Sequence, residues 1–152
     1  MTAFDRLFGL RVLAVHQFVY EHSGGRIGER LGRTPMLLLH TTGRKTRRPR
    51  TAALLYYRDG DRYVVVGSRG GSDAPPAWLL NVEAAPDVEV QIGTMRFPAM
   101  ARVLPASERR RLWPHLVRLW PQYDRYQSQT ERVIPLISLV PQPLSRALGD
   151  MP

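Results

Sequence analysis

The sequence contains no cysteine. This absence excludes disulfides, thiolate catalysis and iron–sulfur ligation. No run of apolar residues is long enough to span a bilayer, and the N-terminus shows no secretory apolar region followed by a small-residue cleavage site. We therefore expect a cytoplasmic protein.

Motifs for metal, nucleophilic and nicotinamide chemistry are also missing. The sequence has neither the Gly-x-Ser-x-Gly motif of serine hydrolases nor the Gly-x-Gly-x-x-Gly fingerprint of a dinucleotide-binding fold. No pair of histidines has the spacing of metal ligands; the four histidines are His16, His22, His40 and His115. An enzyme without these groups usually takes its chemistry from a bound cofactor.

Composition and charge narrow the class of protein. A chain of 152 residues with 43% hydrophobic and 23% charged residues fits one compact globular domain. Its formal net charge of +9 predicts an anionic partner or ligand. Nucleic acid, an acidic lipid surface and a phosphorylated cofactor all meet this condition, so the position of the cations must distinguish among them.

The N-terminal residues 3–21 are predicted to form an amphipathic helix, because apolar side chains recur at helical spacing. We expect the helix to end at Ser23-Gly24-Gly25. Such a helix either packs on its own domain, which is the commoner case, or lies on an anionic membrane surface. The second alternative predicts peripheral contact with the inner face of the cell membrane.

From Pro35 onward, short apolar runs predict strands. Turns at Asp59-Gly60 and Gly93-Thr94 predict two hairpins, and Pro98 predicts an edge strand or a bulge in the second hairpin. The predicted strands cover residues 36–40, 51–57, 62–66, 88–92, 95–104 and 136–140.

Two predicted helices interrupt these strands. One covers residues 76–84, and the other opens near Ser107-Glu108 with an expected kink at Pro114. Mostly antiparallel strands with inserted helices predict an α+β domain built on a small barrel or curled sheet. We expect a single domain over residues 1–141, followed by a flexible tail over residues 142–152.

The strongest local signal is the basic stretch Thr-Thr-Gly-Arg-Lys-Thr-Arg-Arg-Pro-Arg over residues 41–50, between two predicted strands. Backbone N–H groups, hydroxyls and guanidinium groups in such a turn can converge on phosphate or carboxylate oxygens. Three interpretations are open: an anion cradle, a solvated basic hairpin tip and a nucleic-acid patch. The last one lacks the interleaved aromatic residues that single-strand binding normally needs.

Short motifs occur at separated positions along the chain: Arg26-Ile27-Gly28, Leu37-Leu38-Leu39, Thr42-Gly43-Arg44-Lys45-Thr46, Pro49-Arg50, Gly67-Ser68-Arg69-Gly70-Gly71, Trp78-Leu79-Leu80-Asn81-Val82, and then Tyr123, Tyr126-Gln127, Thr130, Arg132 and Ile134-Pro135. In this order and spacing they resemble the deazaflavin (coenzyme F420)-dependent nitroreductase family, whose fold is a split β-barrel. The resemblance covers nearly all of the chain up to Pro141.

The resemblance implies that the cofactor is coenzyme F420, an 8-hydroxy-5-deazaflavin with an anionic phosphodiester and glutamate tail. The family holds that anionic end with its Gly-Arg-Lys loop, so we expect no nucleic-acid partner for the basic stretch. Core packing for Trp78 and a local hydrogen-bonding role for Asn81 are the structural alternatives. The implied cofactor-binding residues are Thr42, Gly43, Arg44, Lys45, Thr46 and Arg50 on the loop, Ser68 and Arg69 beside the deazaflavin, and Trp78 and Asn81 on the following helix.

The resemblance also implies an oxidoreductase that passes hydride from reduced coenzyme F420 to a planar apolar acceptor, either a quinone or a nitroaromatic. Aromatic walls suit such acceptors. The implied acceptor-binding residues are Tyr56 or Tyr57, together with Trp120, Tyr123 and Tyr126. Because Trp120, Tyr123 and Tyr126 have the spacing of one helix face, plain core packing is the alternative. Tyr126 or Ser68 is the candidate proton donor, and a hydroxyl that only fixes the cofactor is the alternative for both.

Two residues depart from the family pattern. Arg47 stands where the family often has glycine, which affects the backbone of the loop. Trp120 stands where better-known relatives carry tyrosine; the missing hydroxyl favours quinone reduction over nitro reduction. Three other functions stay open: an oxidoreductase that uses FMN on the same fold, a non-catalytic deazaflavin-binding protein, and a basic membrane-binding or nucleic-acid-binding module.

Overall fold

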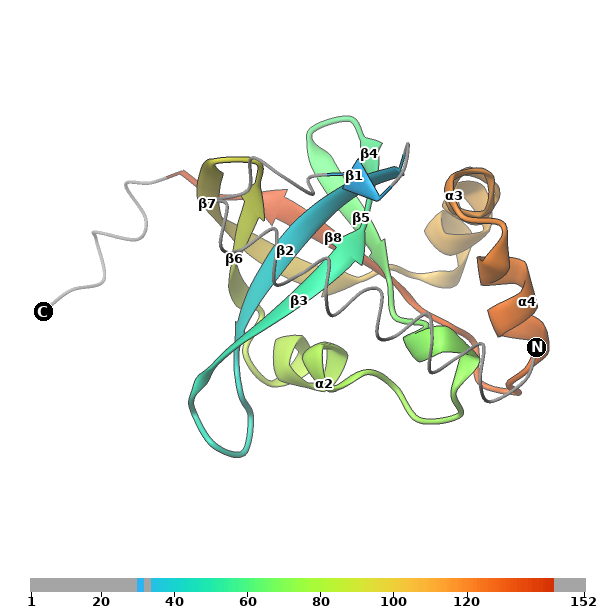
Figure 1. The fold of residues 1–152 in the computed structure, drawn as a ribbon, viewed down its shortest axis with the longest axis horizontal. Coiled ribbons are helices and arrows are strands. Elements are labelled where there is room, and N and C mark those ends of the chain that lie inside the picture. The colour runs from blue at the N-terminus through green and yellow to red at the C-terminus, as the bar shows by residue number, and fades with distance from the viewer. Residues whose placement is uncertain (1–29, 32–33, 144–152) are drawn as a thin grey trace, which may run out of the picture.

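The computed structural model describes residues 30–31 and 34–143. Eight strands form one curled antiparallel sheet in the order β1-β2-β6-β7-β8-β5-β4, with β3 paired to β2. Figure 1 shows the half-barrel that results. The strands are β1 (Arg30–Leu31), β2 (Thr34–Thr42), β3 (Pro49–Leu55), β4 (Tyr57–Asp59), β5 (Arg62–Val66), β6 (Asp87–Ile92), β7 (Met95–Val103) and β8 (Leu136–Pro141).

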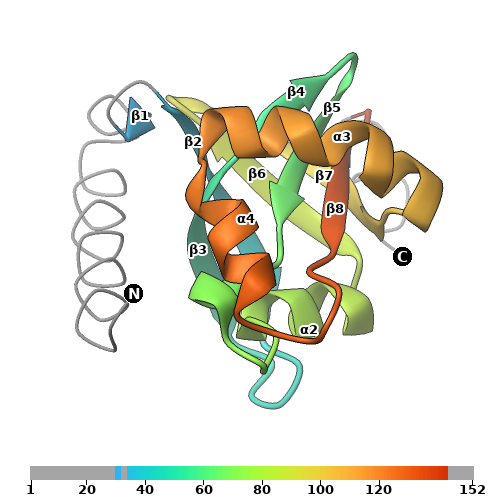
Figure 2. The ribbon, with the colours of Figure 1, turned by 90° about the vertical axis from the view of Figure 1, so that its right-hand side faces the viewer.

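The helices lie on both faces of this sheet. A short 3-10 helix, η1 (Arg69–Gly71), and α2 (Ala77–Ala84) follow β5, while α3 (Ala106–Leu119) and α4 (Gln122–Ser128) lie between β7 and β8. Figure 2 shows α3 and α4 together on one side of the sheet, with α2 at its lower end. The predicted α+β class and curled sheet are therefore confirmed.

Apolar side chains fill both faces of the strands. One core cluster joins Leu37 and Leu39 of β2 to Leu79 and Val82 of α2. The other joins Met36 of β2 to side chains of α3, α4 and β8. Alternate strand residues point to opposite faces of a sheet, so an apolar run without alternation is expected where both faces are covered.

The predicted hairpins are confirmed, with Gly60 and Gly93 at φ of 62° and 59° in their turns. Pro98 does not mark an edge, because β7 lies between β6 and β8. Its carbonyl accepts a hydrogen bond from the Gln142 N–H, just beyond the last β7–β8 pair of Ala99 with Pro141. Because that position lies at the end of the ladder, a residue without an N–H group is tolerated there.

One predicted strand is divided in the structure. The strand predicted over residues 51–57 becomes β3, which pairs with β2, and β4, which starts at Tyr57 and pairs with β5. The helix predicted to open near Ser107-Glu108 is α3, which contains Pro114 and continues to Leu119. The predicted N-terminal helix over residues 3–21 lies outside the described residues, as does most of the predicted tail.

Candidate functional site

The loop between β2 and β3 is the tight turn that carries the basic stretch. The Gly43 N–H group donates to the Arg48 carbonyl at 2.8 Å, and the Arg47 N–H group donates to the Gly43 carbonyl at 2.8 Å. A Cβ atom at Gly43 would lie 2.8 Å from Thr46 Oγ1 and 3.2 Å from the Arg48 carbonyl oxygen. A side chain at position 43 would therefore require the Thr46 side chain to turn away and the Arg48 carbonyl to shift by a few tenths of an ångström.

Asn81 of α2 fastens this loop to the body of the domain. Its buried side chain accepts hydrogen bonds at Oδ1 from the Arg44 backbone N–H at 3.1 Å and from Arg44 Nη1 at 3.5 Å. Its Nδ2 group donates to Thr41 Oγ1 at 3.2 Å. Since both partners lie about 40 residues away in the sequence, the side chain of Asn81 holds the loop instead of a local turn.

A groove of about 420 Å³ lies between this loop and α2. The structure brings together in it seven of the residues implied to bind the cofactor, together with four that sequence reasoning did not select. The exposed Thr42 is not among them. The lining residues are Thr41, Gly43, Arg44, Lys45, Thr46, Arg50, Thr51, Ala52, Ala77, Trp78 and Asn81.

The cations of the loop are exposed, and no carboxylate in the described part of the chain pairs with them. Among the residues that the structure describes, the salt bridges engage only arginines elsewhere: Arg62, Arg96, Arg102 and Arg111. No carboxylate within residues 30–31 and 34–143 pairs with Arg44, Lys45 or Arg50. A groove edged by unpaired cations favours an anionic ligand.

Arg47 occupies the position where a glycine is expected, and its φ of 61° lies in the left-handed region. The loop therefore keeps a glycine-type backbone although the residue is arginine. A non-glycine residue in this region carries a steric cost, because Cβ approaches the following carbonyl oxygen.

Replacing Arg47 by glycine is expected to raise the free energy of unfolding by roughly 0.5–1 kcal/mol, because glycine takes a positive φ without the steric cost. For a domain of this size that gain raises Tm by roughly 1–4 °C. Arg48→Gly is the matched control, since it removes the same charge from the same loop at a residue without a positive φ. Thermal melts in which the two variants shift alike would contradict the strain assigned to Arg47.

The turn formed by Ser68 and η1 is the second element of the site. Ser68 is buried, and its hydroxyl makes no hydrogen bond with any residue in the described part of the chain. The two glycines that flank the turn are closely packed: a Cβ atom added at Gly67 would lie 3.1 Å from Leu79 of α2, and one added at Gly71 would lie 3.0 Å from the backbone of Tyr126 in α4. The turn is therefore held between α2 and α4, as Figure 1 shows along the lower edge of the sheet.

The aromatic residues implied to bind the acceptor fall into two groups. Tyr57, Trp120, Tyr123 and Tyr126 belong to the cluster under α3 and α4. Tyr56 packs on the other face of the sheet, edge-on to Tyr63 with ring centroids 5.4 Å apart. Adjacent strand residues point to opposite faces, so Tyr56 and Tyr57 are not neighbours across one pocket.

The predicted single helix face for Trp120, Tyr123 and Tyr126 is wrong. α3 ends at Leu119, and Trp120 has an extended backbone with φ −144°, as expected before a proline. Tyr123 is fully packed in the core, where burial raises the pKa of its hydroxyl well above the usual range. Tyr126 is only half-buried and lies edge-on to Tyr123, with ring centroids 6.1 Å apart.

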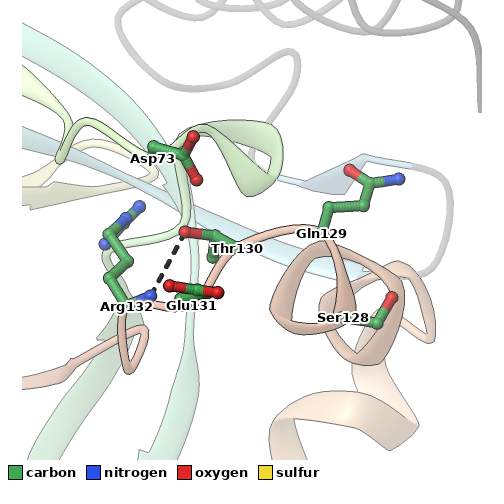
Figure 3. Close-up of a pocket in the computed structure, with 6 residues that line it drawn as sticks. All are labelled: Asp73, Ser128, Gln129, Thr130, Glu131 and Arg132. Carbon is green, nitrogen blue, oxygen red and sulfur yellow. Dashed lines mark hydrogen bonds between the residues drawn. The ribbon is translucent and has the colours of Figure 1, made fainter.

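A second hollow of about 550 Å³ lies beside η1, as Figure 3 shows. None of the residues that line this hollow is a site residue predicted from the sequence. Thr130 and Arg132 belong to the motifs of the resemblance, which assigns them no role. Desolvation lowers the pKa of Arg132 there. Its lining residues are Asp73, Ser128, Gln129, Thr130, Glu131 and Arg132.

Neither a metal site nor a membrane span is present in the described part of the chain. No group of three or more histidine and carboxylate side chains gathers within it. None of its helices has the length and apolar character required to cross a bilayer.

Comparison with known proteins identifies relatives over nearly the whole chain. Residues 12–141 match the family model of the F420H(2)-dependent quinone reductases. An F420H(2)-dependent quinone reductase of Mycobacterium tuberculosis and a putative one of Mycobacterium bovis are each 42% identical over 144 residues, covering 89% of this chain and 93% of the relative.

Solved structures agree with this relationship. A reductase dependent on reduced F420 is 37% identical, with a TM-score of 0.64 over 69% of this chain and 93% of that one. A protein described as a domain-swapped dimer is 32% identical, with a TM-score of 0.66 over 86% of this chain and 98% of that one. A putative pyridoxamine 5′-phosphate oxidase of Listeria innocua, at 17% identity and a TM-score of 0.53, shares the fold. The chain belongs to the F420H(2)-dependent quinone reductase family, whose members are oxidoreductases that use reduced coenzyme F420.

Proposed function

We propose that this protein transfers hydride from reduced coenzyme F420 to quinone-like acceptors, with the anionic end of the cofactor held in the groove between the β2–β3 loop and α2. The observation that carries this proposal is the set of cations at the groove, which no described carboxylate neutralises. When bound, the reduced deazaflavin supplies the hydride. The protein supplies binding, orientation and the exclusion of water.

The groove fits the phosphodiester and glutamate groups of the cofactor. Arg44, Lys45 and Arg50 line it and would hold these anions by charge-assisted hydrogen bonds. Gly43 and Asn81 keep the loop in the required shape, through the close approach to Thr46 and the hydrogen bond to the Arg44 N–H group. These contacts hold the loop to α2, and a loop held in this way loses little binding free energy through ordering when a ligand binds.

Trp78 has two roles in this proposal. It lines the groove, and it also packs against the core cluster under α2. The functional and the structural interpretations of Trp78 are therefore compatible, because one face of an indole can pack while another meets a ligand.

Ser68 and Arg69 would lie beside the deazaflavin, and Tyr126 would lie close to the acceptor. We assign proton donation to the acceptor oxygen to Tyr126 or Ser68. Two observations support this assignment: the Ser68 hydroxyl has no hydrogen-bond partner among the described residues, and Tyr126 is only half-buried. Tyr57 and Trp120 would complete the acceptor wall, and Tyr123 would support it from the core. Tyr56, on the other face of the sheet, takes no part in this wall.

Quinones are expected to be better acceptors than nitroaromatics, because Trp120 offers no hydroxyl to a developing nitro anion. In steady-state oxidation of reduced coenzyme F420, kcat/KM for menadione should exceed that for a nitroimidazole at least about tenfold, the effect of one lost hydrogen bond. In the Trp120→Tyr variant, the ratio of kcat/KM for menadione to kcat/KM for the nitroimidazole should be smaller than in the wild type. Faster turnover of the nitro compound by the wild-type protein would contradict the proposed acceptor, and turnover of neither would contradict the proposed function.

Contact of the predicted N-terminal helix with anionic lipid stays a prediction from the sequence alone.

A further inference from the structure

The side chain of Arg132 gathers three backbone carbonyls of the segment that surrounds η1. Arg132 Nε donates to the Ser72 carbonyl at 2.9 Å, and its Nη2 donates to the Gly67 carbonyl at 3.1 Å and the Ser68 carbonyl at 2.8 Å. The charge thus meets carbonyl dipoles that converge from both ends of one turn. A planar guanidinium with several fixed donors suits such an arrangement, whereas a lysine ammonium does not reproduce its fork.

The turn itself has an unusual backbone that requires support. Arg69, Gly70 and Gly71 have φ angles of 45°, 60° and 80°, three consecutive residues in the left-handed region. Within the turn, Gly71 N–H donates to the Ser68 carbonyl at 3.1 Å and Ser72 N–H donates to the Arg69 carbonyl at 3.2 Å. Such conformations persist when the surrounding structure holds them.

Gln127 of α4 fixes the position of Arg132 in turn. Its Nε2 group donates to the Arg132 carbonyl at 2.8 Å, and its Oε1 atom accepts from the Ile134 N–H group at 2.9 Å. Arg109 Nη2 also donates to that oxygen at 3.0 Å. The backbone from the Arg132 carbonyl to the Ile134 N–H group is therefore bound to the helix that carries Tyr126.

We propose that Arg132 is a positioning residue, which holds Ser68 and Arg69 at a fixed place against α4 and therefore fixes the Ser68 hydroxyl relative to Tyr126. The two candidate proton donors lie on separate elements that meet where Gly71 packs against the Tyr126 backbone. Arg132 binds the turn through three side-chain hydrogen bonds, and its own carbonyl is bound by Gln127 of α4. Its role in the reaction rests on the proposed function, whereas its hold on the turn does not.

Amide hydrogen exchange of the unliganded protein tests the hold on the turn. In Arg132→Met, peptides covering residues 67–72 should exchange at least about tenfold faster, since the bonded amides of Gly71 and Ser72 open with the turn. Arg132→Lys keeps the charge, and its exchange rate over residues 67–72 should lie between those of Arg132→Met and the wild type. This variant provides the test if Arg132→Met does not fold. Arg62→Met is the matched control, because that half-buried arginine pairs with Asp59 and Glu108 away from the turn.

Kinetics with reduced coenzyme F420 and menadione test the consequence for the reaction. kcat/KM should fall by roughly 10²-fold in Arg132→Met, as for other small misplacements of reacting groups, with partial recovery in Arg132→Lys and no fall in Arg62→Met. Unchanged exchange over residues 67–72 would overturn the proposal, as would faster exchange with unchanged kinetics. If the wild-type protein shows no turnover, the proposed function fails, and the exchange result alone then decides whether Arg132 holds the turn.

Discussion

The double variant Lys45→Ala with Arg50→Ala will bind oxidised coenzyme F420 roughly 10²-fold more weakly than the wild type, because each charge-assisted hydrogen bond contributes about 1.5–3 kcal/mol and exposure favours the lower value. Both residues line the groove, and neither forms an ion pair with a carboxylate in the described part of the chain. The Tm should therefore stay nearly constant. Quenching of cofactor fluorescence gives the Kd, and a thermal melt gives the Tm.

Arg47→Ala with Arg48→Ala is the matched control for this experiment. It also removes two positive charges from this loop, but at residues that do not line the groove. A general electrostatic effect would weaken binding equally in both double variants. The cradle assignment predicts a large loss only in the first, and equal losses would show that net charge, not position, governs binding.

Tyr126→Phe will lower the rate of hydride and proton transfer to a quinone by roughly 10²–10⁴-fold if the hydroxyl is the general acid, and by less if water replaces it. The variant keeps the ring that packs edge-on against Tyr123, so quinone binding should survive. Tyr126→Ala removes the wall as well, and its KM for the quinone should rise. Stopped-flow oxidation of the reduced cofactor by menadione, with thermal melts of both variants, gives these quantities.

Tyr123→Phe is the control for the loss of a hydroxyl. Tyr123 lies in the same cluster but is buried, so its hydroxyl cannot reach the acceptor. The Tyr123→Phe variant is therefore expected to leave the reaction rate unchanged. A packing role for Tyr126 predicts a different pattern. Tyr126→Phe would leave the rate and the stability unchanged, and Tyr126→Ala would lower the free energy of unfolding by as much as about 3–5 kcal/mol. That pattern would mean that Tyr126 supports the fold and not the reaction.

The parts of the molecule that depend on neighbouring residues can be predicted from the sequence. Turn residues at Asp59-Gly60 and Gly93-Thr94 define hairpins through local backbone preference. The basic loop is recognisable because its cations and Gly43 lie within a few residues of one another. The left-handed φ of Arg47 also agrees with the glycine expected there, since the backbone keeps its conformation although the residue differs.

The parts that depend on distant contacts cannot be predicted in the same way. Asn81 bonds a loop about 40 residues away, and Arg132 bonds carbonyls 60 and 65 residues away. Nothing local in the sequence distinguishes these residues from surface polar ones. The wrong helix face has a recognisable cause in the sequence, because Pro121 follows Trp120 and α3 ends before that face is complete. The two alternatives Tyr56 and Tyr57 lie in different core clusters, as adjacent positions in extended backbone do.

Titration of the purified protein with coenzyme F420 and with FMN, side by side, tests the central claim most directly. The two cofactors have similar rings, but only coenzyme F420 carries the longer anionic tail that the groove at Arg44, Lys45 and Arg50 would hold. We expect coenzyme F420 to bind at least about tenfold more tightly than FMN, the equivalent of one additional charge-assisted hydrogen bond. Equal or tighter binding of FMN would contradict the assignment of both the cofactor and the groove.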